Sequence, residues 1–301
     1  MVKINELSFQ LEHIKLAALA CGPAEHEPVL CLHGYLDNAA SFLPLMQQLS
    51  AHPDLLIDKR FIALEWAGHG QSQHRSLDAH YHFFDYVHDL ACLFSQNNWP
   101  AINIVAHSMG AMLASAFTAA FPEKVKSLTL IDSLGFICAP AQEASKQLRQ
   151  GILSRNKTVK VSREFTEQTA IKARLNASDL QERHAKLIVK RALNRVESKA
   201  VEDDTTNSHQ ALFSWRSDPR LRTISPYRLT LSQGQQLLKD IKCPVKLIYG
   251  DKGMHRVKAG LEDFATCLAN LSLTELQGGH HIHMEQSEQT ILLLNEFLSS
   301  K

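Results

Sequence analysis

The sequence lacks any long apolar run, any disulfide-like cysteine spacing and any strong excess of one charge. No stretch of its 301 residues approaches the ~20 consecutive apolar residues that a membrane-spanning helix needs. The first residues, up to His13, contain no apolar core and no small-residue cleavage site, so we expect no signal peptide. The 32 Lys+Arg and 31 Asp+Glu nearly cancel, which gives no support for nucleic acid or an anionic membrane as the main partner.

The six cysteines are scattered and form no C-x-x-C pair. Several lie in or beside apolar runs, as Cys31 and Cys92 do. This pattern predicts buried free thiols in a reducing, cytoplasmic compartment, and neither a disulfide framework nor a zinc site. We therefore expect no metal and no cofactor. Sixteen histidines are the one compositional excess.

Short apolar runs alternate with longer amphipathic stretches at both ends of the chain. After an opening hairpin over 6–20, strands are predicted at 28–34, 60–66, 101–108, 125–132, 245–251 and 271–276. Helices are predicted at 39–50, 84–98, 109–121, 256–269 and 286–298. Such alternation is typical of an α/β protein whose mostly parallel sheet is covered by helices on both faces.

The alternation stops between about 135 and 228, where we find no strand-like run but only charged, helical stretches. We therefore predict an α/β core at 1–134 and 229–301, with a helical cap (lid) inserted at 135–228. Residues 141–228 carry 18 Lys+Arg and 10 Asp+Glu, a net of +8, so the remainder carries −7. Three interpretations stay open: attraction of an anionic substrate, docking of the insertion on the core, or solvated helix faces.

The strongest local pattern is a buried strand that runs through Ala106-His107-Ser108-Met109-Gly110 into a helix of small residues. It resembles the G-x-S-x-G nucleophile elbow of the α/β-hydrolases. The sharp turn needs small residues two before and two after the serine. Gly110 supplies one of them, and Ala106 replaces the usual first glycine. The turn would expose the Ser108 hydroxyl and aim the Met109 amide into the site from a helix N-terminus.

His33-Gly34-Tyr35 follows the strand at 28–32 and resembles the H-G-x loop of the same family. In that family the amide of the residue after the glycine completes the oxyanion hole, which implies Tyr35 here. The resemblance makes His33 a residue that ties loops together rather than an acid or a base.

The segment 278–285, GGHHIHME, follows the last predicted strand, where the family keeps its catalytic histidine. The family pattern of Gly-His with a glutamate five residues later matches His280 and Glu285. His281 and His283 are the competitors. The three histidines could also indicate a metal, but a catalytic triad accounts for His280 without one.

The acid of the triad has two candidates. The usual family position, an Asp three residues after the glycine that follows the strand at 245–249, is occupied here by Gly253. Asp132 ends the strand at 125–131, where some family members place the acid, and Asp251 lies two residues before the usual position. We favour Asp132 and keep Asp251 as the alternative.

Residues 65–72, with the motif GHGQS, resemble the family's glycine turn after its fourth strand, which we interpret as structural. Together with segments 33–42, 213–221 and 281–285, they make the chain most similar to the serine hydrolase-like proteins. The resemblance implies an α/β-hydrolase fold with an eight-stranded, mostly parallel sheet and a helical cap. For the pocket that binds a small-molecule substrate, anionic in one interpretation, we name His33, His107, Trp215 and Arg216 as lining candidates. An Arg216 or Arg220 contact with a substrate carboxylate competes with a salt bridge to Asp218.

The chemistry that follows from the resemblance is hydrolysis of an ester-type bond through an acyl-enzyme on Ser108, with His280 as the base. Hydrolysis of a thioester or of a carbon–carbon bond would use the same residues. A binding protein without catalytic activity, on the same scaffold, is the alternative from another class.

Overall fold

The computed structural model describes residues 3–52, 54–55, 57–156, 164–196 and 211–299. Its centre is an eight-stranded sheet with the order β1-β2-β4-β3-β5-β6-β9-β10. The strands are β1 Ile4–Gln10, β2 Lys15–Cys21, β3 Glu27–Leu32, β4 Lys59–Leu64, β5 Ile102–His107, β6 Val125–Ile131, β9 Val245–Gly250 and β10 Leu271–Leu276. β1 and β2 form a hairpin, and β2 pairs antiparallel with β4. The strands β4, β3, β5, β6, β9 and β10 pair parallel with one another in that order. The predicted fold class is confirmed.

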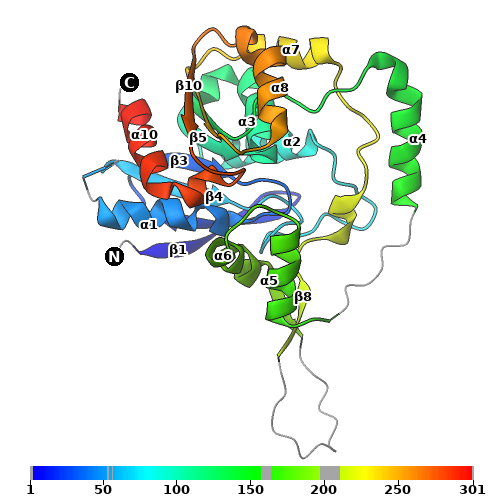
Figure 1. Ribbon diagram of the computed structural model, residues 1–301, viewed down its shortest axis with the longest axis horizontal. Coiled ribbons are helices and arrows are strands. Elements are labelled where there is room, and N and C mark those ends of the chain that lie inside the picture. The colour runs from blue at the N-terminus through cyan, green and yellow to red at the C-terminus, as the bar shows by residue number, and fades with distance from the viewer. Residues whose placement is uncertain (1–2, 53, 56, 157–163, 197–210, 300–301) are drawn as a thin grey trace, which may run out of the picture.

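Helices cover both faces of this sheet (Figure 1). One face packs against α1 (Leu43–Ala51) and α10 (Ser287–Ser299). The other packs against α2 (Asp85–Gln96), α3 (Met109–Ala120), α7 (Leu231–Lys239) and α8 (His255–Phe264). Consecutive residues of one strand serve opposite faces: Leu30 lies in the α2–α3 core and Cys31 in the α1–α10 core. Every residue of β5 is buried, as expected for a central parallel strand.

The structure has a helix, α7, within residues 229–244, where no helix or strand was predicted from the sequence. Thr230 caps this helix in a reciprocal capping box with Gln233. The Thr-x-x-Gln spacing was the signal that could have revealed the helix.

Residues 135–228, the predicted insertion, contain three α-helices within the described ranges: α4 Ala144–Arg155, α5 Glu167–Asn176 and α6 Glu182–Ala192. In Figure 1, α5, α6 and β8 lie together below the sheet, while α4 stands apart at one side. The prediction that this region has no strand is wrong, because β7 (Leu193–Val196) pairs antiparallel with β8 (Leu212–Trp215). Strands of four residues are too short to show a clear alternation of apolar and polar side chains.

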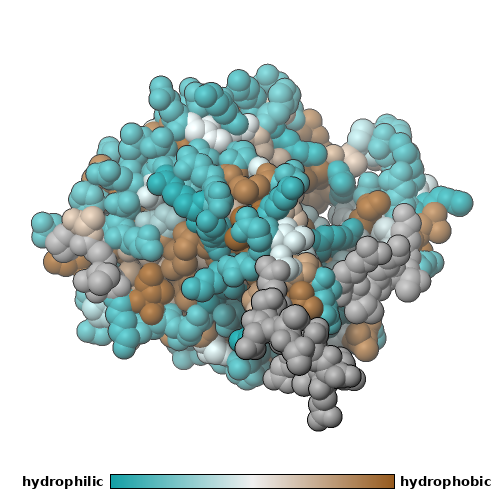
Figure 2. Space-filling model, turned by 60° about the horizontal axis from the view of Figure 1, so that its bottom comes forward, coloured by the Kyte–Doolittle hydropathy of each residue, from teal (hydrophilic) through white to brown (hydrophobic). Residues whose placement is uncertain are grey.

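The molecular surface is mostly hydrophilic on the face shown in Figure 2, with apolar side chains scattered over it. No helix in the described ranges is long and apolar enough to span a membrane. Cys21, Cys31 and Cys267 are buried as predicted, whereas Cys92 and Cys138 are partly exposed.

Candidate active site

Ser108 occupies the sharp turn between β5 and α3. Its backbone has φ 53° and ψ −117°, a strained conformation for a residue with a side chain. The start of α3 passes close to the end of β3, because a Cβ at Gly110 would lie 2.4 Å from the Leu32 carbonyl oxygen. The glycine at position 110 therefore has a direct steric cause. The turn leaves Ser108 partly exposed at the carboxyl edge of the sheet.

A chain of two hydrogen bonds connects the three residues that we favoured from the sequence. His280 Nε2 lies 2.9 Å from Ser108 Oγ, and His280 Nδ1 lies 2.6 Å from Asp132 Oδ2. With Nδ1–H donating to the carboxylate, Nε2 is left to accept the proton of the hydroxyl group. The side chain of Asp132 is fully buried and that of His280 is 18% exposed. The serine of this chain of hydrogen bonds is therefore partly exposed to solvent, whereas the carboxylate is buried.

Backbone amides fix the Asp132 carboxylate. Asp132 accepts hydrogen bonds from the amides of Gly250 (3.1 Å) and Met254 (2.9 Å), and its own φ is +46°. A Cβ at Gly253 would lie 2.1 Å from Asp132 Oδ1. The Asp132 carboxylate thus fills the space that a side chain at position 253 would need, which explains physically why this chain has glycine at the family's usual acid position.

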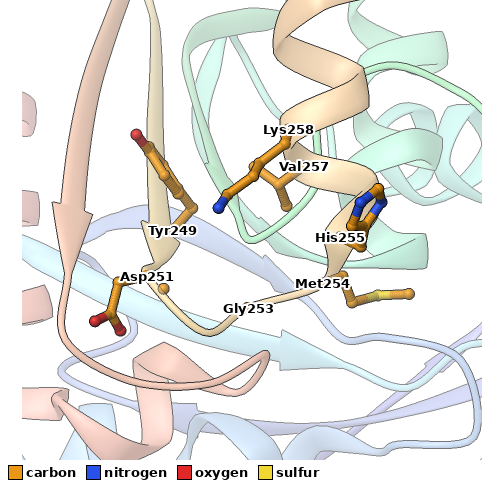
Figure 3. A pocket seen from close by; sticks show the side chains of 8 residues that line it. Tyr249, Asp251, Gly253, Met254, His255, Val257 and Lys258 are labelled. Carbon is orange, nitrogen blue, oxygen red and sulfur yellow. The ribbon is translucent and has the colours of Figure 1, made fainter.

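Asp251, the alternative acid, has a different partner. Its Oδ1 accepts a hydrogen bond of 2.8 Å from the amide of Gly278. Figure 3 shows Asp251 and Met254 on opposite sides of the loop that follows β9, beside a cavity of about 130 Å³. The structure therefore brings Asp132, and not Asp251, to His280.

The two predicted oxyanion amides belong to segments that meet at Ser108. Met109 is the first residue of α3, so its amide has no acceptor within the helix. Tyr35 follows Gly34, where an added Cβ would lie 3.1 Å from Ser108 Cβ. Among the described residues, neither amide has a protein acceptor. Both remain available to bind a developing negative charge.

The other histidines of the segment 278–285 do not contact Ser108. His281 pairs with Asp37 and Asp179, and the fully buried ring of His283 packs on Phe42. Burial holds the pKa of His283 well below its usual range, so this ring is neutral.

His33 and His107 are wrong as pocket-lining candidates, because both are fully buried. His33 Nδ1 contacts the Gly34 carbonyl at 2.8 Å, and His33 Nε2 accepts from the Trp66 amide at 3.2 Å, so His33 ties the loops after β3 and β4. Burial lowers the pKa of His107 to about 4, and this neutral ring donates from Nε2 to the His280 carbonyl at 2.9 Å. His107 thereby supports the backbone of His280.

The side chains of Trp215 and Arg216 contact residues of the insertion. The Trp215 ring lies 5.1 Å from that of Phe165, and Arg216 Nε donates to the Leu193 carbonyl at 2.8 Å. These contacts do not place either residue at Ser108. Arg220 forms the predicted salt bridge with Asp218 at 2.7 Å.

The glycine turn after β4 is structural, as interpreted from the sequence. Glu65 is fully buried and accepts hydrogen bonds from the amides of Ala39 (3.2 Å) and Gln71 (2.7 Å). A Cβ at Gly70 would lie 2.0 Å from Glu65 Oε1. The turn therefore wraps around a buried carboxylate.

Two side-chain groups within the described ranges have donor atoms spaced for a metal: His13 with His88 and Cys92, and the buried set of Asp37, His107 and His281. In the second set the Arg174 guanidinium also contacts Asp37. A cation already neutralises that carboxylate, which makes the set an ion-pair network.

Two functional contacts were missed from the sequence. Asp37 ends the loop at 33–37 that carries the Tyr35 amide (the oxyanion loop) and pairs with Arg174, and Asp179, between α5 and α6, accepts a hydrogen bond from the His280 amide. Each of these two pairs joins residues more than 100 positions apart in the chain, and no local spacing marks such a pairing.

Comparison with known proteins agrees with this geometry. The family model described as alpha/beta hydrolase fold matches residues 27–287. The serine hydrolase-like protein of Danio rerio is 27% identical over 92% of this chain and 83% of its own length. Human serine hydrolase-like protein 2 is 25% identical over 98% of this chain and 94% of its own. A hypothetical protein of Pseudomonas aeruginosa superposes with a TM-score of 0.82 at 30% identity, covering 98% of this chain and 99% of that one. The chain therefore belongs to the α/β-hydrolase fold family.

Proposed function

We propose that the protein is a serine hydrolase that cleaves carboxylic esters of small or medium size through an acyl-enzyme on Ser108. The observation that carries the proposal is the hydrogen-bonded chain from Ser108 Oγ through His280 to Asp132, with distances of 2.9 Å and 2.6 Å. Nucleophile, base and orienting carboxylate within hydrogen-bond reach are the arrangement that activates a serine.

In the first half-reaction, His280 Nε2 takes the hydroxyl proton while Ser108 Oγ attacks the ester carbonyl carbon. The carbonyl oxygen becomes an oxyanion, which the amides of Tyr35 and Met109 bind. The tetrahedral intermediate collapses, His280 gives its proton to the departing alkoxide, and an alcohol leaves.

In the second half-reaction, His280 takes a proton from water, which attacks the acyl carbon on Ser108. The acid leaves, and the serine recovers its proton from His280. Asp132 stays ionised throughout. It keeps the Nδ1–H tautomer of His280 in place and stabilises the imidazolium that forms in both steps.

The arrangement of arginines bears on the substrate's charge. Arg174, Arg191 and Arg220 of the insertion are paired with the carboxylates of Asp37, Glu65 and Asp218 respectively. All three cations serve the protein's own carboxylates. Asp218 lies in the insertion itself, but the pairs with Asp37 and Glu65 connect the insertion to the core, which supports docking of the insertion over capture of an anionic substrate. We therefore propose uncharged esters as the better substrates.

The test is hydrolysis of p-nitrophenyl esters of increasing acyl length, with p-nitrophenyl thioesters assayed in parallel. We expect Ser108→Ala to lower kcat/KM by roughly 10³-fold or more. Ser145→Ala, an exposed serine of α4, is the matched control and should leave it unchanged. Activity that survives in Ser108→Ala would overturn the proposal. A preference for thioesters would keep the nucleophile but change the substrate class.

A further inference from the structure

One corner of the insertion contacts both loops of the candidate active site. We call residues 174–180, which run from the end of α5 towards α6, the α5–α6 corner. Its Asp179 accepts the backbone N–H of His280 with Oδ2, and Asp179 Oδ1 lies 3.0 Å from His281 Nδ1. A carboxylate from the insertion therefore holds the backbone of the histidine that contacts Ser108.

The glycine that precedes His280 leaves space for this carboxylate. A Cβ at Gly279 would lie 2.1 Å from Asp179 Oδ2. Gly279 does not have a positive φ, so its backbone conformation alone would accept an alanine. The closest steric obstacle at this position is Asp179, and Glu285 Oε1 follows at 3.2 Å.

The same corner holds the oxyanion loop. The Arg174 guanidinium forms an ion pair with Asp37 and contacts the Leu36 carbonyl oxygen at 3.4 Å. Asp37 is 3% exposed, so this ion pair is shielded from water. In the next residue, Asn38 Nδ2 donates to the Ile188 carbonyl of α6 at 2.9 Å. The segment that carries the Tyr35 amide is thus fixed to the insertion at two consecutive residues.

His281 connects the two contacts. Its Nε2 lies 3.4 Å from Asp37 and its Nδ1 lies 3.0 Å from Asp179. The Arg174 guanidinium and the rings of His107, His280 and His283 also face it. Although burial opposes protonation, the two carboxylates raise the pKa of His281 to about 9, so the ring is charged at neutral pH.

Apolar contacts also join the insertion to the core beside His281. Leu180, Ala185 and Ile188 of the insertion form a buried cluster with Met284, which belongs to the segment 278–285. A mobile lid would expose this cluster and separate the ion pairs whenever it opened. The corner is therefore built as a permanent contact.

We propose that the α5–α6 corner stays in contact with the active site and holds two of its segments in place. Asp179 is a positioning residue for His280, and Arg174 is one for the oxyanion loop. The proposal rests on the proposed hydrolase function and extends it to residues of the insertion. Asp179 acts through the His280 backbone, so its loss should displace the imidazole from Ser108 and slow the chemical step. Substrate binding should change much less.

The experiment compares Asp179→Ala, Asp179→Asn and Gly279→Ala in p-nitrophenyl ester hydrolysis. Asp179→Ala should lower kcat by roughly 10- to 100-fold with KM within about twofold, the range expected for a misplacement of about 1 Å. Asp179→Asn should recover most of kcat, because its amide oxygen still accepts the His280 N–H. Glu182→Gln, at an exposed residue of α6 that lies outside the corner and pairs with Lys186, is the control and should match the native protein.

Gly279→Ala provides a second and independent variant. In the native background its methyl group would collide with Asp179, so kcat should fall as in Asp179→Ala. In the Asp179→Ala background the collision is absent, and the double variant should be no slower than Asp179→Ala alone. Additive losses, or a kcat of Asp179→Ala equal to that of the native protein, would overturn the proposal.

A readout without substrate separates this proposal from the proposed function. The His280 Nδ1 proton that bonds Asp132 should give a far-downfield NMR resonance, absent in Asp132→Asn. It should persist in Asp179→Asn and Glu182→Gln and broaden or vanish in Asp179→Ala. If the native protein cleaves no ester but the resonance responds in this way, the function fails and the positioning role stands. An unchanged resonance in Asp179→Ala would refute the positioning role.

Discussion

The core and the insertion of this protein are stabilised by different interactions. The core buries apolar side chains from both faces of its sheet, in two large clusters. Within its described residues, the insertion has a small cluster of its own, formed by Ala170, Ile171, Val189 and Leu193, and it joins the core through the buried ion pairs of Arg174 with Asp37 and Arg191 with Glu65. The near-neutral total of the whole chain is the sum of +8 on residues 141–228 and −7 on the remainder, and each of these pairs joins a cation of the first to a carboxylate of the second.

The proposed catalytic residues make the sharpest comparison between the two regions, because Ser108, His280 and Asp132 all belong to the core. We expect Asp132→Asn to lower kcat by roughly 10³- to 10⁴-fold, since the amide no longer favours the Nδ1–H tautomer of His280. Asp251→Asn should stay within about threefold of the native rate, because Asp251 bonds only a loop amide. Steady-state kinetics on a p-nitrophenyl ester decides between them. A large loss in Asp251→Asn with little in Asp132→Asn would reverse the assignment.

The next largest expected effect is on the free energy of unfolding, and it concerns the ion pair between Arg191 and Glu65. Arg191 is 8% exposed, Glu65 is fully buried, and Arg191 also reaches Glu6. We expect Arg191→Met to lower the free energy of unfolding by about 3–5 kcal/mol, because it leaves a buried carboxylate without its cation.

Lys186→Met on the same helix removes only an exposed pair with Glu182 and should cost less than about 1 kcal/mol. Urea denaturation measures both variants. Equal losses would mean that the insertion does not depend on its buried ion pairs.

The pH dependence of the free energy of unfolding tests the contacts of His281 with Asp37 and Asp179. Its pKa is raised from 6.5 to about 9 on folding, so its stabilisation is complete below pH 6.5 and disappears as the pH rises through 9. The shift corresponds to about 3 kcal/mol. The difference in unfolding free energy between the native protein and His281→Gln should therefore shrink across this range. A constant difference from pH 6 to 9.5 would contradict a charged His281.

The smallest effect concerns charge steering by the basic insertion. Because its arginines Arg174, Arg191 and Arg220 are already paired, kcat/KM for an anionic ester should change less than about twofold between 0.05 M and 0.5 M salt. A neutral ester of the same acyl length is the control. A steep fall for the anionic ester alone would restore the steering interpretation.

Local patterns in the sequence were enough to predict the sheet, the serine turn and the histidine loop. Small residues around Ser108 and the alternation of strands and helices act over a few residues, so their causes are visible in a short window. The choice between Asp132 and Asp251 was harder, because it depends on the space above Gly253, which only the packed loops define. The roles of Asp37 and Asp179 could not be predicted, since their partners are distant in the chain and meet only after folding.

The short strands β7 and β8 and the helix α7 were missed for another reason. Four-residue strands have little periodicity, and the α7 signal was a capping box rather than an apolar repeat. The pocket candidates His33 and His107 failed because a histidine beside an active site can serve the backbone instead of the substrate. Both are fully buried and contact main-chain groups.

The proposed function requires Ser108 to be an activated nucleophile. The most direct measurement treats the protein with a fluorophosphonate and locates the adduct by peptide mass spectrometry. We predict one adduct, on the peptide that contains Ser108, formed at a rate that Asp132→Asn reduces and absent in Ser108→Ala. An unlabelled native protein, or an adduct on another residue that persists in Ser108→Ala, would contradict it.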